Sequence, residues 1–185
     1  MGPYPVMLAL VMDLINGVPL TLHRTYLAVN GTGKAEVGDE DAKRLLGTPG
    51  VDTCSGGGIP LASLCNTTIV GVAEGIETAL AVTKATGMPM IACVSASMLA
   101  SIKLPTHISR VVIWADNDTE KYGKRVGQLK AKELEERLIA EKRIVLTQVA
   151  PCINGKDGVD WLDLLNTLGK EPFKRIQMIP ARHVA

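Results

Sequence analysis

The chain has 185 residues, of which 46% are hydrophobic, 21% charged and 3% aromatic, and its 20 basic and 19 acidic residues leave a net charge of +1. This length suits one main domain, and the near-average composition excludes a wholly disordered chain. The small net charge excludes an overall basic field that attracts polyanions, and the scarcity of aromatic residues argues against a stacking platform for single-stranded nucleic acid. Any nucleic-acid contact must therefore come from a local basic patch or from metal ions.

The apolar start of the chain, PYPVMLALVM, reaches Asp13 before it could span a bilayer, and it lacks a basic leader. We therefore expect a first strand there, no membrane partner and a cytoplasmic location. The four cysteines, Cys54, Cys65, Cys93 and Cys152, are scattered without a CxxC pair. They are interpreted as free thiols, not as zinc ligands.

Alternating apolar residues predict a β-meander over residues 6–29, with a turn at Asn16 and Gly17, a pair that hairpins favour. The polar, glycine-containing stretch that follows predicts loops and one short helix at about Asp41–Leu46. Together these elements predict a small β-rich N-terminal subdomain over residues 1–66.

The segment NGTGKAE, residues 30–36, ends like a phosphate-binding loop but departs from that motif. The motif requires a glycine five residues before Gly33, and this chain has Ala28 there. The segment also leads into no apolar-periodic helix. We therefore interpret it as a loop and expect no helicase motor.

From residue 67 onward, short apolar runs alternate with helical segments, a pattern typical of a parallel sheet with helices on its faces. The predicted strands are residues 67–73, 88–94, 111–115 and 143–149, and the predicted helices are residues 77–87, 97–102, 121–143 and 160–169. In the longest helix the spacing predicts a buried stripe of Val126, Leu129, Leu134 and Leu138. We expect an α/β domain over residues 67–170, with a mostly parallel sheet and flanking helices, and a C-terminal tail over residues 171–185.

Acidic residues follow three of the predicted strands. They are Glu74 after the first strand, Asp116 and Asp118 after the third, and Asp157 and Asp160 after the fourth. Ligands of open parallel sheets bind outside the carboxyl ends of the strands, where these residues fall. The joint position predicts one acidic site.

The DxD spacing of Asp116 and Asp118 suits a hard cation, because residues two apart in an extended chain point to the same side. Mg²⁺ is held by one or two carboxylates together with substrate phosphates, so such a site implies a phosphate-bearing substrate. Asn117, between them, is expected to face away and to matter less. The alternative is that each acid only caps a helix, since Asp and Asn accept hydrogen bonds from free backbone amides.

The three acidic segments read AEGIETALA, WADND and GKDGVDWLDLL. They resemble the three signatures of the Toprim domain, which topoisomerases and primases share. Their residues are similar to those of the Toprim module of plasmid and phage primases and primase-helicases, and the resemblance covers about residues 67–168. Upstream, HRTYLAVNGTGKA and KRLLG also resemble the segment that precedes this module in those mobile-element proteins.

The resemblance implies roles for individual residues. It implies that Glu74 is the catalytic acid or base, that Asp116 and Asp118 bind metal, and that Asp160 is a further metal contact. Asp157 is a secondary candidate in the third signature.

One position departs from the family pattern. Where replicative primases place a further acid four residues after the glutamate, this chain has Thr78. Glu77 lies one residue earlier and is a second secondary candidate. The number of metals is therefore open.

Basic residues near these segments are candidates for phosphate or nucleic-acid contacts: Arg24, Lys43, Arg44 and Lys156. The alternative for each is a solvated surface position. The long helix, rich in both Lys and Glu, is interpreted as a solvated face.

The resemblance implies a DNA primase module that uses Mg²⁺ or Mn²⁺ to build RNA primers, with single-stranded DNA and nucleoside triphosphates as partners. A replicative helicase, or a zinc-binding module of a longer parent chain, is a further candidate partner. The alternatives are a Toprim nuclease that cleaves phosphodiester bonds and a non-catalytic module that binds nucleic acid or a replication partner. Topoisomerase activity is disfavoured because 185 residues leave little room for strand passage.

Overall fold

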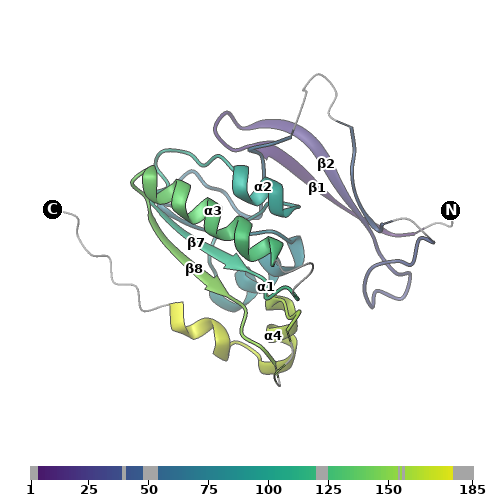
Figure 1. Ribbon diagram of the computed structural model, residues 1–185. Helices are drawn as coiled ribbons and strands as arrows, with labels where there is room; N and C mark the ends of the chain where they lie inside the picture. The colour runs from purple at the N-terminus through teal and green to yellow at the C-terminus, as the bar shows by residue number, and fades with distance from the viewer. Residues whose placement is uncertain are drawn as a thin grey trace.

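The computed structural model describes residues 4–38, 41–47, 54–119, 125–153, 155 and 157–176. These residues form two sheets, a three-stranded antiparallel sheet near the N-terminus and a mostly parallel five-stranded sheet flanked by helices (Figure 1). The predicted α/β class, with a β-rich N-terminal part, is confirmed.

The N-terminal sheet consists of β1 (Val6–Asp13), β2 (Val18–Tyr26) and β3 (Lys43–Leu45), in that order. The predicted hairpin is confirmed, and it projects away from the body of the molecule (Figure 1). The short helix predicted around residues 41–46 is wrong, because β3 pairs antiparallel with β2 and sets Arg44 opposite Arg24. Pairing with a distant strand satisfies the backbone of this segment, and a local pattern does not encode such a partner.

The larger sheet has the order β4-β6-β5-β7-β8. Its strands are β4 (Ile59–Pro60), β5 (Ile69–Ala73), β6 (Met90–Ala92), β7 (Arg110–Ala115) and β8 (Ile144–Val149). The four predicted strands are confirmed and run parallel, whereas the unpredicted β4 adds an antiparallel edge beside β6. Almost every residue of β5 and β7 is buried, as expected for strands covered on both faces.

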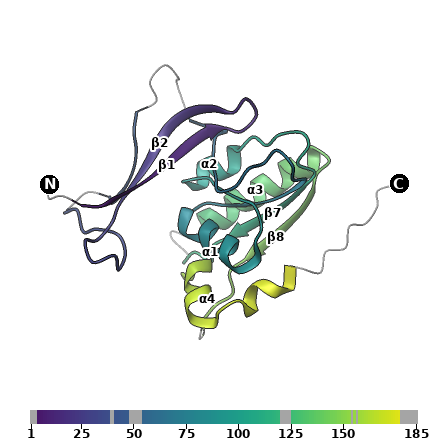
Figure 2. The same ribbon diagram turned by 180° about the vertical axis from the view of Figure 1, so that it is seen from behind.

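The helices are α1 (Ile76–Thr86), α2 (Ala96–Ser101), α3 (Val126–Ala140) and α4 (Trp161–Leu168). Helices α2 and α3 pack together on one face of the sheet, and α1 and α4 pack together on the other (Figures 1 and 2). Along the described chain, no helix combines the length and the apolar character needed to cross a bilayer.

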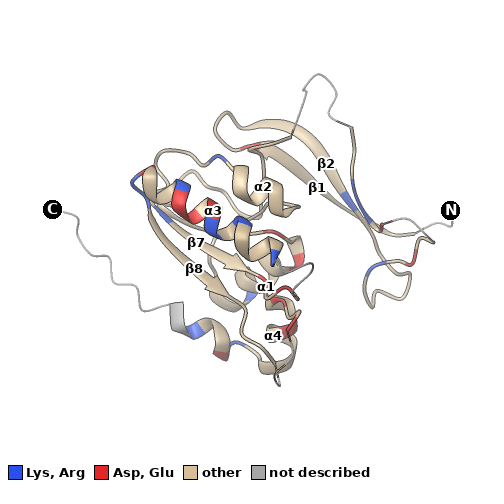
Figure 3. Cartoon of the chain, in the orientation of Figure 1, with Lys and Arg blue, Asp and Glu red and all other residues tan. Residues whose placement is uncertain are grey.

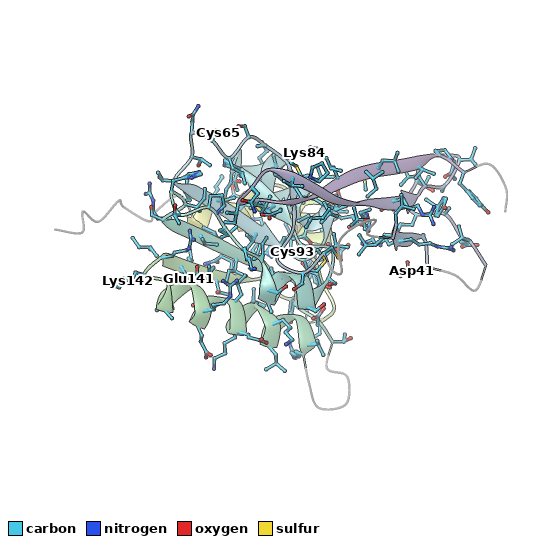
Figure 4. All side chains as sticks on the ribbon, turned by 90° about the horizontal axis from the view of Figure 1, so that it is seen from above. Asp41, Cys65, Lys84, Cys93, Glu141 and Lys142 are labelled. Carbon is cyan, nitrogen blue, oxygen red and sulfur yellow. The ribbon has the colours of Figure 1, made fainter. Side chains whose placement is uncertain are left out.

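Helix α3 runs along its face of the sheet toward Glu141 and Lys142 (Figure 4). Its buried residues are Ala131, Leu134 and Leu138. The prediction that Val126 and Leu129 share this stripe is wrong, since each is 52% exposed. Leu129 precedes Leu134 by five residues, which turns it by roughly 140° around the helix axis and away from the sheet.

An aromatic cluster joins the end of β7 to the start of α4. The rings of Trp114 and Trp161 meet edge to face with centroids 4.6 Å apart, and Phe173 packs against both. Trp161 Nε1 donates a hydrogen bond to the carbonyl oxygen of Ala115 at 3.0 Å. Phe173 belongs to a 3₁₀ helix, η1 (Glu171–Ile176), which begins the segment expected to be a tail. The cluster therefore fixes the position at which β7 ends.

Replacing Trp161 by Phe should destabilise the protein more than replacing Trp114 by Phe. Both side chains are buried, but Trp114 Nε1 has no hydrogen-bond partner in the described part of the chain. The Trp161 variant also loses a hydrogen bond, a difference of about 1 kcal/mol. Urea denaturation of both variants measures it. Equal losses would contradict an anchoring role for the Trp161 hydrogen bond.

Candidate active site

The acidic residues lie where the strand order of the larger sheet reverses. Helix α1 leaves β5 on one face and α3 leaves its neighbour β7 on the other, so a crevice opens between the carboxyl ends of these two strands. Such switch points are where doubly wound sheets bind ligands. Glu74 directly follows β5 and Asp116 directly follows β7. Figure 3 shows acidic positions gathered between α1, α4 and the start of α3.

Asp116 lies deepest in this crevice. Its Oδ1 accepts a hydrogen bond from Thr78 Oγ1 at 2.9 Å. Burial raises the pKa of Asp116 to about 7, against the lowering effect of the Thr78 hydrogen bond, and the charges of Asp160, Glu74 and Asp118 raise it further. The four carboxylates are therefore close enough to repel one another.

Burial also raises the pKa of Glu74, and the charge of Asp118 adds to the effect, while the backbone N–H of Ala96 opposes it. Ala96 begins α2, and the chain reaches it through Val94, whose φ is +70°. A β-branched residue rarely adopts this conformation, so the turn beside Glu74 is strained. No sequence signal marks Val94, and the sequence analysis missed this turn.

The approach of Asp118 to the site depends on a glycine. Asp118 Oδ2 accepts a hydrogen bond from the backbone N–H of Gly127 at 3.0 Å, at the start of α3. A Cβ atom on residue 127 would lie 2.4 Å from Asp118 Oδ2 and 3.6 Å from Glu74 Oε2. A side chain at this position would displace the Asp118 carboxylate from where it lies, and the two acids border the same small space.

Asp160 caps a helix as well as facing the site. Its Oδ1 accepts the backbone N–H of Asp163 at 2.8 Å, and the Asp163 side chain accepts the N–H of Asp160, which completes a capping box on α4. Asp160 also lines a cavity of about 440 Å³ together with Asp116 and Asp118. Capping and convergence on one site are thus not exclusive alternatives here.

Asn117 lines the cavity of about 440 Å³ beside Asp116 and Asp118, and its side chain is held by a hydrogen-bond network of its own. The side chain is 5% exposed, and its Nδ2 donates to Cys152 Sγ at 3.2 Å. Its Oδ1 accepts from Arg125 Nη1 at 2.8 Å and from Gln128 Nε2 at 3.2 Å. Arg125 Nη2 also contacts Asp157 Oδ2 at 2.7 Å, so Asp157 belongs to this network and not to the acidic cluster.

Two lysines of the N-terminal part reach the larger sheet's first helix. Lys43 Nζ lies 2.9 Å and Lys34 Nζ 3.4 Å from Glu77 Oε1. Burial alone would raise the pKa of Glu77, but the hydrogen bond and charge of Lys43 and the charge of Lys34 lower it overall. Both lysines line a cavity of about 390 Å³ that also exposes Glu74 and Asp116. Lys34 was missed because its segment was set aside as a loop.

The arginine candidates lie elsewhere. The guanidinium groups of Arg24 and Arg44 sit 5.7 Å and 5.8 Å from the ring centre of Tyr26. Neighbouring strand residues alternate between faces, so Arg44 points away from the side of the sheet that carries Lys43. The structure therefore does not bring these arginines to the acids. Lys156 lies outside the described residues.

The chemistry of the acidic cluster fits a hard divalent cation. Its donors are carboxylate oxygens, the ligands that Mg²⁺ and Mn²⁺ prefer, and a cation would relieve their repulsion. Among the described residues, however, no three His, Cys, Asp or Glu side chains already form a metal-binding group. Asp116, Asp118 and Asp160 each direct one oxygen at a protein donor. The second oxygen of each is the one that a cation would use.

The metal-free protein should lose stability as the pH rises from about 5 to 8. The pKa of Asp116 is raised to about 7, so from about pH 5 up to about pH 7 the folded protein holds a proton that the unfolded chain has released. Glu74, whose pKa is also raised, acts in the same direction, whereas His23, whose pKa burial lowers, acts in the opposite one.

Asp116→Asn should remove most of this decline while leaving His23 in place. Melting temperatures in EDTA at pH 5, 6, 7 and 8 compare the variant with the wild type. If the melting temperatures of the two proteins fell equally with rising pH, Asp116 would not be the cause of the decline.

Comparisons with known proteins agree with this arrangement. No curated protein matches the chain. A solved DNA primase domain from Pseudomonas aeruginosa superposes with a TM-score of 0.58 at 15% identity, over 90% of this chain and 48% of that one, so the chain spans about half its length. At this identity the similarity concerns the fold. The family model of the Toprim domain matches residues 69–171, which include all three acidic strand ends, and the chain belongs to the Toprim domain family.

Proposed function

We propose that this chain is the Toprim module of a primase of the plasmid or phage type, which builds RNA primers on single-stranded DNA with Mg²⁺ or Mn²⁺. The observation that carries the proposal is the convergence of Glu74, Asp116, Asp118 and Asp160 at the switch point of the sheet. The similarity of fold to a DNA primase domain supports it. The assignment to mobile elements rests on the particular residues of the three acidic segments.

A bound divalent cation would neutralise the triphosphate and lower the barrier to attack by the 3′ hydroxyl. Asp116 and Asp118 would hold it, with Asp160 as a further contact. Glu74 lies beside them, and its raised pKa makes its carboxylate a stronger proton acceptor than an ordinary glutamate, which suits a group that takes the hydroxyl proton. Catalysis of this kind rests on positioning and electrostatics.

Lys34, between β2 and β3 of the N-terminal sheet, and Lys43, in β3, suit the phosphates of a nucleotide. Lys34 and Lys43 line the same cavity as Glu74 and Asp116, and both contact Glu77. Their side chains are 50% and 31% exposed, so an incoming phosphate can reach them. Arg24 and Arg44, on the other face of that sheet, are proposed contacts for the template strand and not for the reacting phosphates.

Purified protein should incorporate labelled nucleotides on single-stranded DNA with Mg²⁺ or Mn²⁺, in company with any helicase or zinc-binding partner that it requires. Asp118→Asn should lower incorporation by at least about 100-fold, because it removes a metal ligand. Glu136→Gln, which neutralises an exposed acid on α3, is the matched control and should leave it unchanged.

The same assay distinguishes the other functions. Metal-dependent shortening of the labelled strand, abolished by Asp118→Asn, would identify a nuclease instead of a primase. Biological activity that survives Asp118→Asn, despite lost metal binding, would identify a non-catalytic binding module.

Two substitutions of Asp160 distinguish its role as a helix cap from its proposed role as a metal ligand. Serine caps helices about as well as aspartate, so Asp160→Ser should keep the melting temperature while weakening Mn²⁺ binding to the isolated protein. Asp160→Ala should weaken Mn²⁺ binding equally and also cost about 1 kcal/mol of stability. Isothermal titration and thermal denaturation measure the two effects. Mn²⁺ affinity unchanged in the serine variant would reduce Asp160 to a helix cap.

A further inference from the structure

Thr78 makes an unusual contact for a threonine inside a helix. It is the third residue of α1, is 2% exposed, and donates its hydroxyl to Asp116 Oδ1 at 2.9 Å. The other threonines of α1, Thr83 and Thr86, donate instead to carbonyl oxygens four residues earlier, at 3.0 Å and 2.7 Å. That local bond is the usual choice for a helical threonine. The residue four before Thr78 is Glu74, which precedes the N-cap Gly75, so the helix offers Thr78 no such carbonyl and its hydroxyl bonds a distant carboxylate.

The contact constrains how Asp116 can present its oxygens. A carboxylate rotates easily about its last bond unless a donor holds one oxygen. The β-branched side chain of Thr78 is stiff, and its burial leaves it no room to change rotamer. One oxygen of Asp116 is thereby held against α1, and the other is left for the cavity that Glu74 and Asp160 also line.

We infer that Thr78 is a positioning residue that holds Asp116 as a one-oxygen ligand for the divalent cation. The inference rests on the proposed function, because it needs a metal at this site. The hydroxyl that orients Asp116 is neutral, so it leaves the charge of the cluster unchanged. Such groups hold a ligand without touching the metal, and removing one weakens metal affinity by about 10 to 100-fold.

The test compares variants that differ only in the hydroxyl. Thr78→Val keeps the branched shape and removes the donor, and it should weaken Mn²⁺ binding to the isolated protein by about 10 to 100-fold. Thr78→Ser keeps the donor and should bind Mn²⁺ nearly as the wild type does. Thr83→Val removes a hydroxyl of the same helix that bonds to the carbonyl oxygens of Ala79 and Met88 and not to a carboxylate, and it should leave the affinity unchanged. Electron paramagnetic resonance of free Mn²⁺ gives the affinities without any nucleotide or DNA.

The outcomes separate the inference from the function beneath it. Wild-type affinity in Thr78→Val, with binding lost in Asp118→Asn, would overturn the role of Thr78 and leave the metal site standing. Absence of Mn²⁺ binding in the wild type would overturn both. If Thr78→Val does not fold, Thr78→Ala takes its place beside Thr78→Ser, and equal affinities in that pair would overturn the inference. Primer synthesis should follow the Mn²⁺ affinities, with recovery in the serine variant.

Discussion

The first turns of four helices point at one group of carboxylates, and this convergence shapes the whole active site. Thr78 of α1 and the backbone N–H groups of Ala96, Gly127 and Asp163, in α2, α3 and α4, each hold one acid. The N-terminus of a helix carries a partial positive charge, so these ends offset the burial and the repulsion that together raise the pKa of Asp116. Because the helices alternate with parallel strands, their starts meet at the carboxyl ends of the sheet. The fold thus supplies a favourable field for these negative charges.

The N-terminal sheet contributes to the charge balance from outside the parallel sheet. Lys34 and Lys43 contact Glu77 and keep its carboxyl charged, although burial favours the neutral form. These ion pairs are partly exposed, so salt screens them, and each contributes little to stability by itself. Their more important effect is geometric. They place two ammonium groups at the mouth of the cavity and link the hairpin to α1, the helix that also carries Thr78.

Sequence reasoning located the site where it followed from topology and failed where it needed tertiary partners. Parallel strands end at one edge, so the acids after β5, β7 and β8 could be grouped without a structure. The exposure of Leu129, the strand at β3 and the contact of Lys34 with Glu77 each depend on which surface another segment covers. Asn117 could have been suspected, because a polar residue two positions after a buried strand needs partners if it is buried too. The hydroxyl of Thr78 could not, since a helical threonine ordinarily bonds within its own helix.

Gly127 makes the start of α3 important for the position of Asp118, although the exposed side of this helix carries several charged residues. A helix start normally tolerates any small residue, and alanine stabilises a helix better than glycine. At this position the added methyl group would enter the space occupied by Asp118 and come close to Glu74. A gain in local helix stability would then come with displacement of a carboxylate from the site. Local helix stability and the position of the Asp118 carboxylate therefore make opposite demands on this residue.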